Sequence, residues 1–330
     1  MPGHTRYIWM DLLNITSIVG VLMMHTNDAQ NCYSGDLTFD FIWGCAVHSF
    51  YMWPVIVFYM LSGCNLMNYF DIRKYIHKRM TKVVFPFVFW SILFAFLKRN
   101  ELSGWEYINA FLNGKILIIM WFFIPLFAIY FSIPFLRVFV LNSNRTKIEL
   151  FLVLSFLFCS VIPFLNKLFP IEVNTQMFPM ACNFLWYAVL GYYLGHFDFP
   201  IHKRRIIYFI GSVSLIIHFT GFVLLNYISG TSNTIFMNST VPTSVCMGVA
   251  IFIWFRYKNW SCFENHSKLI AYISSCTFGI YLIHVPIKIA LLAYAPILIS
   301  NIWGVAPLYI VSLLTVVLIK KIPLVKNVVP

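Results

Sequence analysis

The stretch that decides the fold is residues 8–27, IWMDLLNITSIVGVLMMHTN. It is long enough and apolar enough to cross a membrane as one helix, because about 20 residues span the ~30 Å of hydrocarbon in a bilayer. The same stretch carries three polar side chains, Asp11, Asn14 and His25. In a helix Asp11 and Asn14 are neighbours on one face, and His25 returns to that face roughly 16 Å further along the axis.

Two interpretations of these polar residues are open. Ionisable groups inside a bilayer are costly and usually face the interior of a helix bundle or a water-filled cavity, which predicts a polar track that ends in a titratable imidazole. Alternatively, His25 anchors one end of the helix at the membrane interface and Asp11 lies near the other headgroup layer.

The composition of the whole chain is that of a polytopic membrane protein. Of the 330 residues, 60% are hydrophobic and only 10% are charged, whereas a soluble chain carries about 25% charged residues. The formal net charge of +12 could suggest a nucleic-acid partner, but the basic residues lie in short loops between apolar segments and no nucleic-acid-binding motif accompanies them. The eight cysteines and nine histidines show no metal-ligand spacing, so no metal site is predicted.

We predict an all-α integral membrane fold, with residues 1–330 as a single polytopic domain of about ten transmembrane helices. The predicted spans are 8–27, 41–67, 83–98, 117–139, 149–166, 177–195, 206–228, 239–255, 269–292 and 296–319. With both termini in the cytoplasm, 18 of the 23 lysine and arginine residues fall on the inner side, as the positive-inside rule requires. This topology places His25 at the outer face and Asp11 near the inner face.

The second predicted span combines a histidine, a proline and a small-residue pair. His48 lies towards its outer end, Pro54 in its middle and Ser62-Gly63 near its inner end. Pro54 removes a helix hydrogen bond and should kink the span. For Ser62-Gly63, close packing between helices is the simplest interpretation.

A basic segment follows at the predicted inner surface. Its cations recur at spacings of one, three and four residues, which predicts a basic helix face: Arg73, Lys74, His77, Lys78, Arg79 and Lys82. This face could hold anionic lipid headgroups, or it could hold the phosphates of a cytoplasmic cofactor by charge and hydrogen bonding.

The later spans offer weaker indications of function. Trp121 opens one span and is typical of the aromatic belt at a membrane interface. Gly191 and Gly195 have the spacing of helix-packing positions. Tyr281 and His284 in the ninth span could belong to a polar cavity shared with the other membrane histidines.

Taken together, six segments in order resemble the membrane-bound acyltransferase family 3, the integral-membrane O-acetyl- and O-acyltransferases of bacterial surface polysaccharides. They are WMDLLNITSIVGVLMMHT (9–26), VIVFYMLSGCNLMNY (55–69), IHKRMTKVVFPFVFWSILF (76–94), MWFFIPLFAIYFSIPFLR (120–137), LWYAVLGYYLG (185–195) and TFGIYLIHVPI (277–287).

The resemblance implies that acyl groups, usually acetyl, pass from cytoplasmic acyl-CoA to hydroxyls of glycans or glycolipids outside the bacterial cytoplasmic membrane. Acyl-CoA is then a donor co-substrate, and no permanently bound cofactor is expected. His25 matches the family's first-span histidine, a base or transient acyl carrier. Asn14 stands where the family pattern has an arginine, so a fixed positive charge is missing here.

Other residues receive expected roles in this reaction. The lysine and arginine residues of the basic segment would bind the donor phosphates: Arg73, Lys74, Lys78, Arg79 and Lys82. Asp11 would support the polar track of the first span, and the developing oxyanion needs donors, which Ser62, Tyr281 or Asn14 could supply. The residues expected to bind substrate are His48, Trp121, Tyr281 and His284. Two other functions remain open: a transporter or flippase for a lipid-linked sugar, and a sensory or scaffold domain that has lost activity.

Overall fold

The computed structural model describes residues 7–27, 33, 35–69, 71–97, 104–169, 173–174, 184–299, 302–323 and 325–330. Helices dominate these residues and no β-strand occurs among them, which confirms the predicted all-α class. Eight helical segments in this part of the chain are long and apolar enough to cross a membrane. The prediction of ten spans rests on two further segments. They contain the shorter helices α10 (Leu185–His196) and α14 (Val305–Lys321), and the start of the predicted span 177–195 lies outside the described residues.

The chain divides into two compact units. The first comprises Met1–Met67 and Phe135–Ser267, and the second comprises Asn68–Pro134 and Lys268–Pro330.

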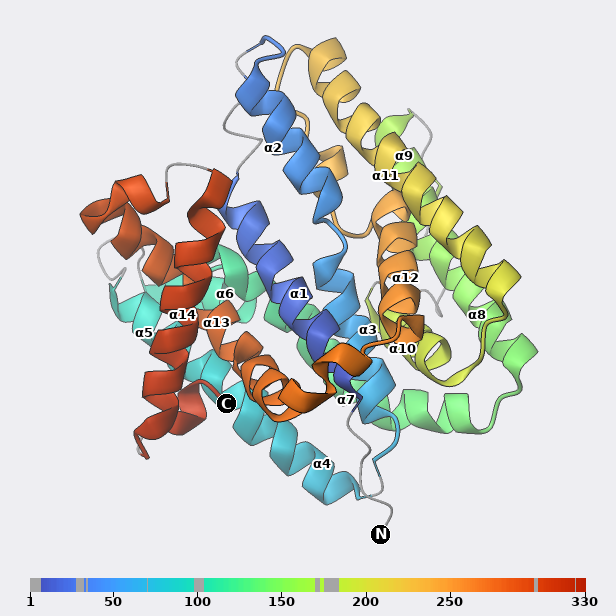
Figure 1. Ribbon diagram of the computed structural model, residues 1–330, viewed down its shortest axis with the longest axis horizontal. Helices are drawn as coiled ribbons and strands as arrows, with labels where there is room; N and C mark the ends of the chain where they lie inside the picture. Colours follow the sequence, from blue (N-terminus) through green and yellow to red (C-terminus); the bar gives the residue numbers. More distant parts are fainter. Residues whose placement is uncertain are drawn as a thin grey trace. The chain divides into compact units, whose positions relative to one another are not determined.

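In the first unit, α1 (Ile8–Thr26) packs against α3 (Pro54–Leu66), and α11 (Ile201–Ser229) packs along both α2 (Phe39–Phe50) and α12 (Pro242–Tyr257) (Figure 1). The predicted span 149–166 is built from α8 (Arg145–Phe156), a π-helical turn (Leu157–Val161) and α9 (Ile162–Leu168). Asn144 caps α8 by accepting a hydrogen bond from the backbone N–H of Lys147 at 3.0 Å.

The proline in the second predicted span interrupts the helix. Helix α2 ends at Phe50, and α3 begins at Pro54, which occupies the first turn. Proline fits there because the first turn of a helix does not use its backbone N–H groups as donors within the helix. The predicted kink is therefore confirmed in a stronger form, as a break between two helices.

Glycines bring α3 and α10 into backbone contact. A Cβ atom placed on Gly63 would overlap the carbonyl of Ala188, and one on Gly191 would overlap the carbonyl of Met60. A Cβ atom on Gly195 would overlap the sulfur of Cys64. These glycines are packing positions, as their spacing predicts.

Replacing Gly191 with alanine is expected to lower the free energy of unfolding by about 1–3 kcal/mol, because the new methyl group forces two helix backbones apart. Thermal unfolding of the detergent-solubilised protein measures the change. Gly104→Ala is the matched control, since a Cβ atom at Gly104 meets nothing within 4 Å. Equal melting temperatures for the two variants would contradict this description of the α3–α10 contact.

The second unit begins with one long helical run. Helix α4 (Ile72–Arg79) continues through a π-helical turn (Met80–Val84) into α5 (Phe85–Leu97). The basic segment and the predicted span 83–98 are thus a single element, which explains why that span looks short in the sequence. Asp71 starts the run by accepting hydrogen bonds from the backbone N–H groups of Arg73 and Lys74, at 2.9 and 3.1 Å.

The rest of this unit comprises α6 (Gly104–Leu112), the first part of α7 (Phe123–Leu141), α13 (Ser267–Tyr294) and α14. Residues 326–330 pack back onto it. Val329 is fully buried and lies against Gly279 of α13. The indole Nε1 of Trp90 on α5 donates to the carbonyl of Val328 at 2.8 Å, so this segment is part of the packed interior.

Candidate active site

Helix α1 packs closely against the break between α2 and α3. Gly20 allows close approach there, since a Cβ atom on it would lie 2.7 Å from Cγ of Pro54 and 2.9 Å from Cδ1 of Tyr51. At the end of α1, Asn27 accepts a hydrogen bond from Nε1 of Trp43 on α2 at 3.3 Å. His25 lies in the last turn of α1, between these two contacts.

The burial of these side chains agrees with a polar face inside the bundle. Asp11 is buried, and Asn14 and His25 are half-buried. The imidazole of His25 therefore lies at an edge of the packed part of the first unit. This position is compatible with both interpretations of the polar residues of α1.

His48 belongs to a different part of the first unit. Its ring is buried and lies 6.3 Å from the ring of Phe222 on α11, measured between centroids. His218 on α11 is also buried, and its Nδ1 lies 2.8 Å from Oγ1 of Thr243. His218 is therefore a packed residue of the first unit.

Ser62 uses its hydroxyl within its own helix. Its Oγ donates to the carbonyl of Phe58 at 2.9 Å, one turn earlier in α3. In this conformation its proton is therefore committed to the backbone, and a role as an oxyanion donor requires a change of rotamer.

In the second unit, α13 presents Tyr281 and His284 together. The Tyr281 hydroxyl donates to the carbonyl of Ile119 at 2.7 Å, and Nδ1 of His284 lies 2.7 Å from the carbonyl of Tyr281. A carbonyl only accepts, so Nδ1 carries a proton and donates this hydrogen bond. Both residues are buried, so α13 holds an imidazole in a fixed orientation.

Trp121 belongs to the 3₁₀ turn Ile118–Phe122. This turn is far from Tyr281 in the sequence but contacts it in the structure, because it contains Ile119. The neighbouring Phe122 ring packs 5.0 Å from the Tyr281 ring, whereas Trp121 itself is 40% exposed. Its exposure fits the aromatic-belt interpretation as well as a role in binding substrate.

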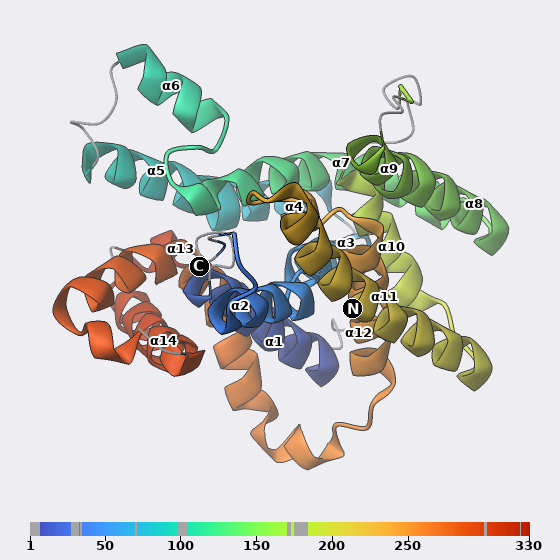
Figure 2. The ribbon, with the colours of Figure 1, turned by 90° about the horizontal axis from the view of Figure 1, so that it is seen from above.

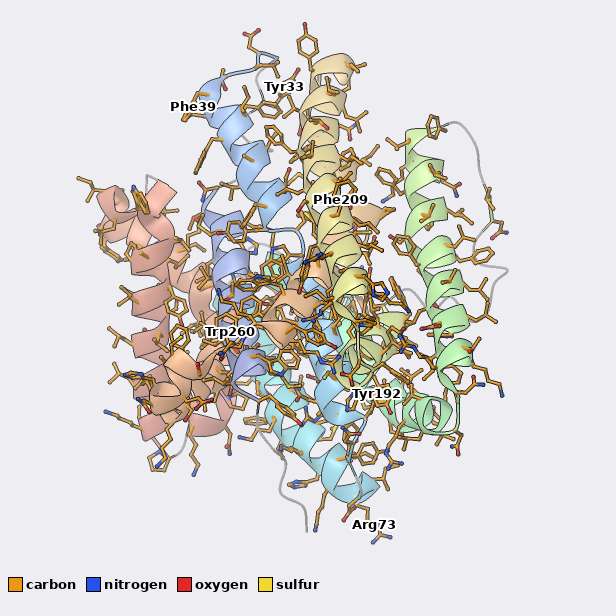
Figure 3. The ribbon with its side chains drawn as sticks, turned by 45° about the vertical axis from the view of Figure 1, so that its right-hand side comes forward. Tyr33, Phe39, Arg73, Tyr192, Phe209 and Trp260 are labelled. Carbon is orange, nitrogen blue, oxygen red and sulfur yellow. The ribbon has the colours of Figure 1, made fainter. Side chains whose placement is uncertain are left out.

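The cations of the basic segment separate into two kinds. Arg73, Lys74, Lys78 and Lys82 are exposed, and Figure 3 shows Arg73 pointing away from the ribbon at the start of α4. Arg79 is half-buried instead.

Aromatic rings hold the Arg79 side chain in place. Its guanidinium carbon lies 5.7 Å from the ring centroid of Tyr75 and 5.2 Å from that of Tyr130. The Tyr75 hydroxyl donates to the carbonyl of Tyr130 at 2.8 Å, and the Tyr69 ring stacks on Tyr75 at 4.5 Å. The sequence alone does not show that these tyrosines contact Arg79, because Tyr130 is 55 positions away from Tyr75. The two rings therefore hold the planar guanidinium of Arg79 in one orientation.

The family model described as an acyltransferase domain matches residues 7–321 of this chain. The chain belongs to acyltransferase family 3. The match includes α1 with its polar face, the basic helix α4 and the His284 region of α13. No curated protein and no solved structure matches the chain.

Membership of this family makes the protein a membrane acyltransferase. The chemistry of the described side chains fits acyl transfer. Imidazoles titrate near physiological pH, and positive charge is available for an anionic donor.

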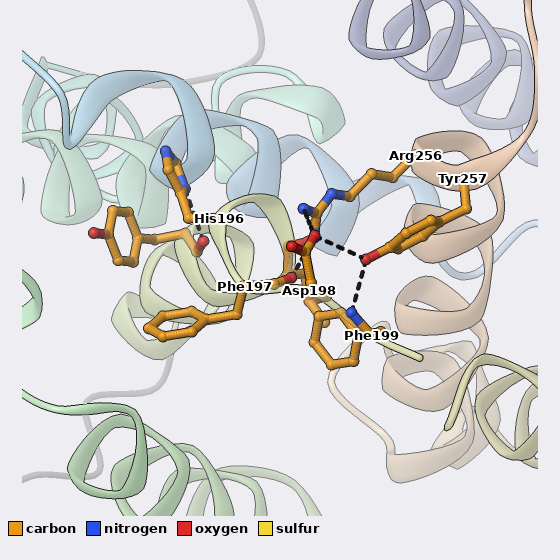
Figure 4. A network of polar contacts seen from close by, with 8 residues as sticks. His196, Phe197, Asp198, Phe199, Arg256 and Tyr257 are labelled. Atoms are coloured by element: carbon orange, nitrogen blue, oxygen red, sulfur yellow. Dashed lines mark hydrogen bonds and ion pairs between the residues drawn. The ribbon is translucent and has the colours of Figure 1, made fainter. Parts of the chain in front are cut away.

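A further polar network lies at the end of α10 in the first unit (Figure 4). Arg256 donates to the carbonyls of Leu194 and Phe197 at 2.6 and 2.5 Å and pairs with Asp198 at 3.2 Å. Burial, aided by the positive charge of Arg256, lowers the pKa of the nearby His196 imidazole below its usual value. Because Arg256 satisfies carbonyls at a helix end, we interpret this network as structural.

Proposed function

We propose that the protein transfers an acyl group, acetyl in the first instance, from cytoplasmic acyl-CoA to a hydroxyl of a glycan or glycolipid on the outer side of the bacterial cytoplasmic membrane. The observation that carries the proposal is the half-buried His25 on the polar face of α1, within a chain that the acyltransferase family model matches over residues 7–321.

In the proposed reaction His25 acts on the acceptor hydroxyl or on the acyl group itself. As a base, it removes the hydroxyl proton while the oxygen attacks the thioester carbonyl. The C–S bond then breaks, and the CoA thiolate leaves and takes up a proton. As a transient carrier, the imidazole nitrogen first bonds to the acyl carbon while the C–S bond breaks and the CoA thiolate leaves. In the second step the acceptor oxygen bonds to the acyl carbon, the C–N bond breaks, and the hydroxyl proton passes to the freed imidazole.

Asn14 is the feature of α1 that departs from the family pattern. It is half-buried, one turn from the buried Asp11 carboxylate. An amide can donate hydrogen bonds to a developing oxyanion, but it supplies no fixed positive charge. We propose that Asn14 and Asp11 orient groups along this face.

Arg79 is the best candidate to bind the donor. A guanidinium held by two tyrosine rings loses little freedom when it binds a phosphate bidentately. The exposed cations Arg73, Lys74, Lys78 and Lys82 would add attraction for a polyanion such as CoA. The alternative partner, anionic lipid headgroups, requires only the exposed charges.

For the acceptor, we propose roles within each unit taken by itself. His48 in the first unit, and Trp121, Tyr281 and His284 in the second, are proposed to bind glycan hydroxyls. Histidine and tyrosine side chains can exchange hydrogen bonds with sugar hydroxyls, and the exposed Trp121 offers an apolar face to a sugar ring.

Binding of labelled acetyl-CoA to the purified protein tests this function against the alternatives. We expect saturable binding that free CoA displaces, and acyl transfer when a glycan acceptor is added. A transporter or flippase for a lipid-linked sugar would move glycan without any dependence on acetyl-CoA. A sensory or scaffold domain that retains the fold would bind the donor without turnover.

A further inference from the structure

Helix α6 stands out in the second unit because none of its residues is buried. Figure 2 shows it beside α5, apart from α14. It contacts the unit through Phe111, whose ring lies 5.5 Å from that of Phe87 on α5. On the same face as Phe111, Tyr107 and Ala110 are half-buried.

The remaining surface of α6 has two chemically distinct stripes. Trp105, Ile108 and Leu112 follow each other at spacings of three and four residues and therefore share a face. They are 82%, 48% and 66% exposed. Glu106 and Asn109 lie on the next face, where Asn113 donates to the side chain of Asn109 at 2.8 Å.

An amphipathic helix with a packed face, an apolar face and a polar face suits the boundary of a bilayer. The helices on either side of α6 in the chain belong to segments that can span a membrane. In α5, Ile92 and Phe96 are both 62% exposed, and such a surface on a membrane-spanning helix faces lipid. In the chain, α6 is the next described helix after α5.

We propose that α6 is an interfacial helix whose stripe of Trp105, Ile108 and Leu112 inserts between the headgroups and acyl chains of the bilayer, at the membrane surface where α5 ends. Tryptophan favours this depth. The exposed Lys115, just beyond α6, supplies a cation for the lipid phosphates. The bilayer is favoured over a protein partner because the polar face beside the stripe would remain in water.

Spin labels on single cysteines test the insertion in the full chain, reconstituted in phospholipid vesicles. Ile108→Cys and Asn109→Cys are adjacent exposed positions on the two faces, in a background where all eight native cysteines are replaced by serine. Collision with oxygen, which concentrates in lipid, is compared with collision with a water-soluble nickel chelate. Trp105→Cys and Leu112→Cys extend the apolar series, and Glu106→Cys extends the polar one.

We expect labels at 105, 108 and 112 to collide more with oxygen and to be protected from the nickel chelate, with the reverse at 106 and 109. Equal access of the chelate to both faces would overturn the proposal, because α6 would then lie in water. Protection of 105, 108 and 112 from both reagents would also overturn it, because protein would cover the stripe. Neither outcome depends on acyl transfer, so the proposed function is tested separately.

Discussion

Replacing His25 with alanine is expected to reduce acylation of the cell-surface glycan by about 10²- to 10⁴-fold, the range that a positioned general base contributes. The variant keeps the packing of α1, because Gly20 still meets Tyr51 and Pro54 and Asn27 still binds Trp43. Acyl groups released from the glycan by mild base and quantified by mass spectrometry provide the measurement.

His202→Ala is the matched control for this substitution. His202 is an exposed histidine at the start of α11, outside the proposed catalytic and binding residues, and we expect its replacement to leave acylation unchanged. Membrane levels of both variants are compared by immunoblot. Normal acylation by a well-expressed His25→Ala protein would remove His25 from the mechanism.

The second large effect is expected at Arg79. Loss of a charge-assisted hydrogen bond costs about 1.5–3 kcal/mol, which corresponds to a rise of roughly 10- to 100-fold in the KM for acyl-CoA. Arg79→Ala should show this rise with little change in kcat, since the phosphates lie far from the reacting thioester. Arg79→Lys keeps the charge but loses the planar fork held by Tyr75 and Tyr130, so its KM should also rise, by a smaller factor.

Steady-state kinetics with acyl-CoA as the varied substrate measure this effect. Lys321→Gln removes one exposed positive charge from the same unit and should leave KM nearly unchanged. If Arg79→Ala and Lys321→Gln raise KM equally, Arg79 contributes only general charge, and its fixed orientation has no role in donor recognition.

Local sequence signals were sufficient for much of the fold. The apolar run at 8–27 forms α1, Pro54 divides α2 from α3, and the glycine spacing at 191 and 195 marks a close helix contact. In each case the physical cause lies in the residue itself: a long apolar run, a missing N–H, or a missing side chain.

Features that depend on distant residues could not be predicted in this way. The sequence shows five lysine and arginine residues from Arg73 to Lys82, but only the fold brings Arg79 against the rings of Tyr75 and Tyr130. Likewise, hydropathy does not show that Nδ1 of His284 is bonded to the carbonyl of Tyr281. In the sequence, the basic segment looks separate from the following span because charged residues give way abruptly to apolar ones. In the structure, the helix continues from one into the other.

The most direct test of the central claim is acyl transfer by the purified protein in proteoliposomes that contain acetyl-CoA and a glycan acceptor. We predict release of CoA thiol that requires both substrates, yields ester-linked acetyl on the glycan, and is lost in His25→Ala. Movement of the glycan across the membrane with the thioester left intact would contradict the account.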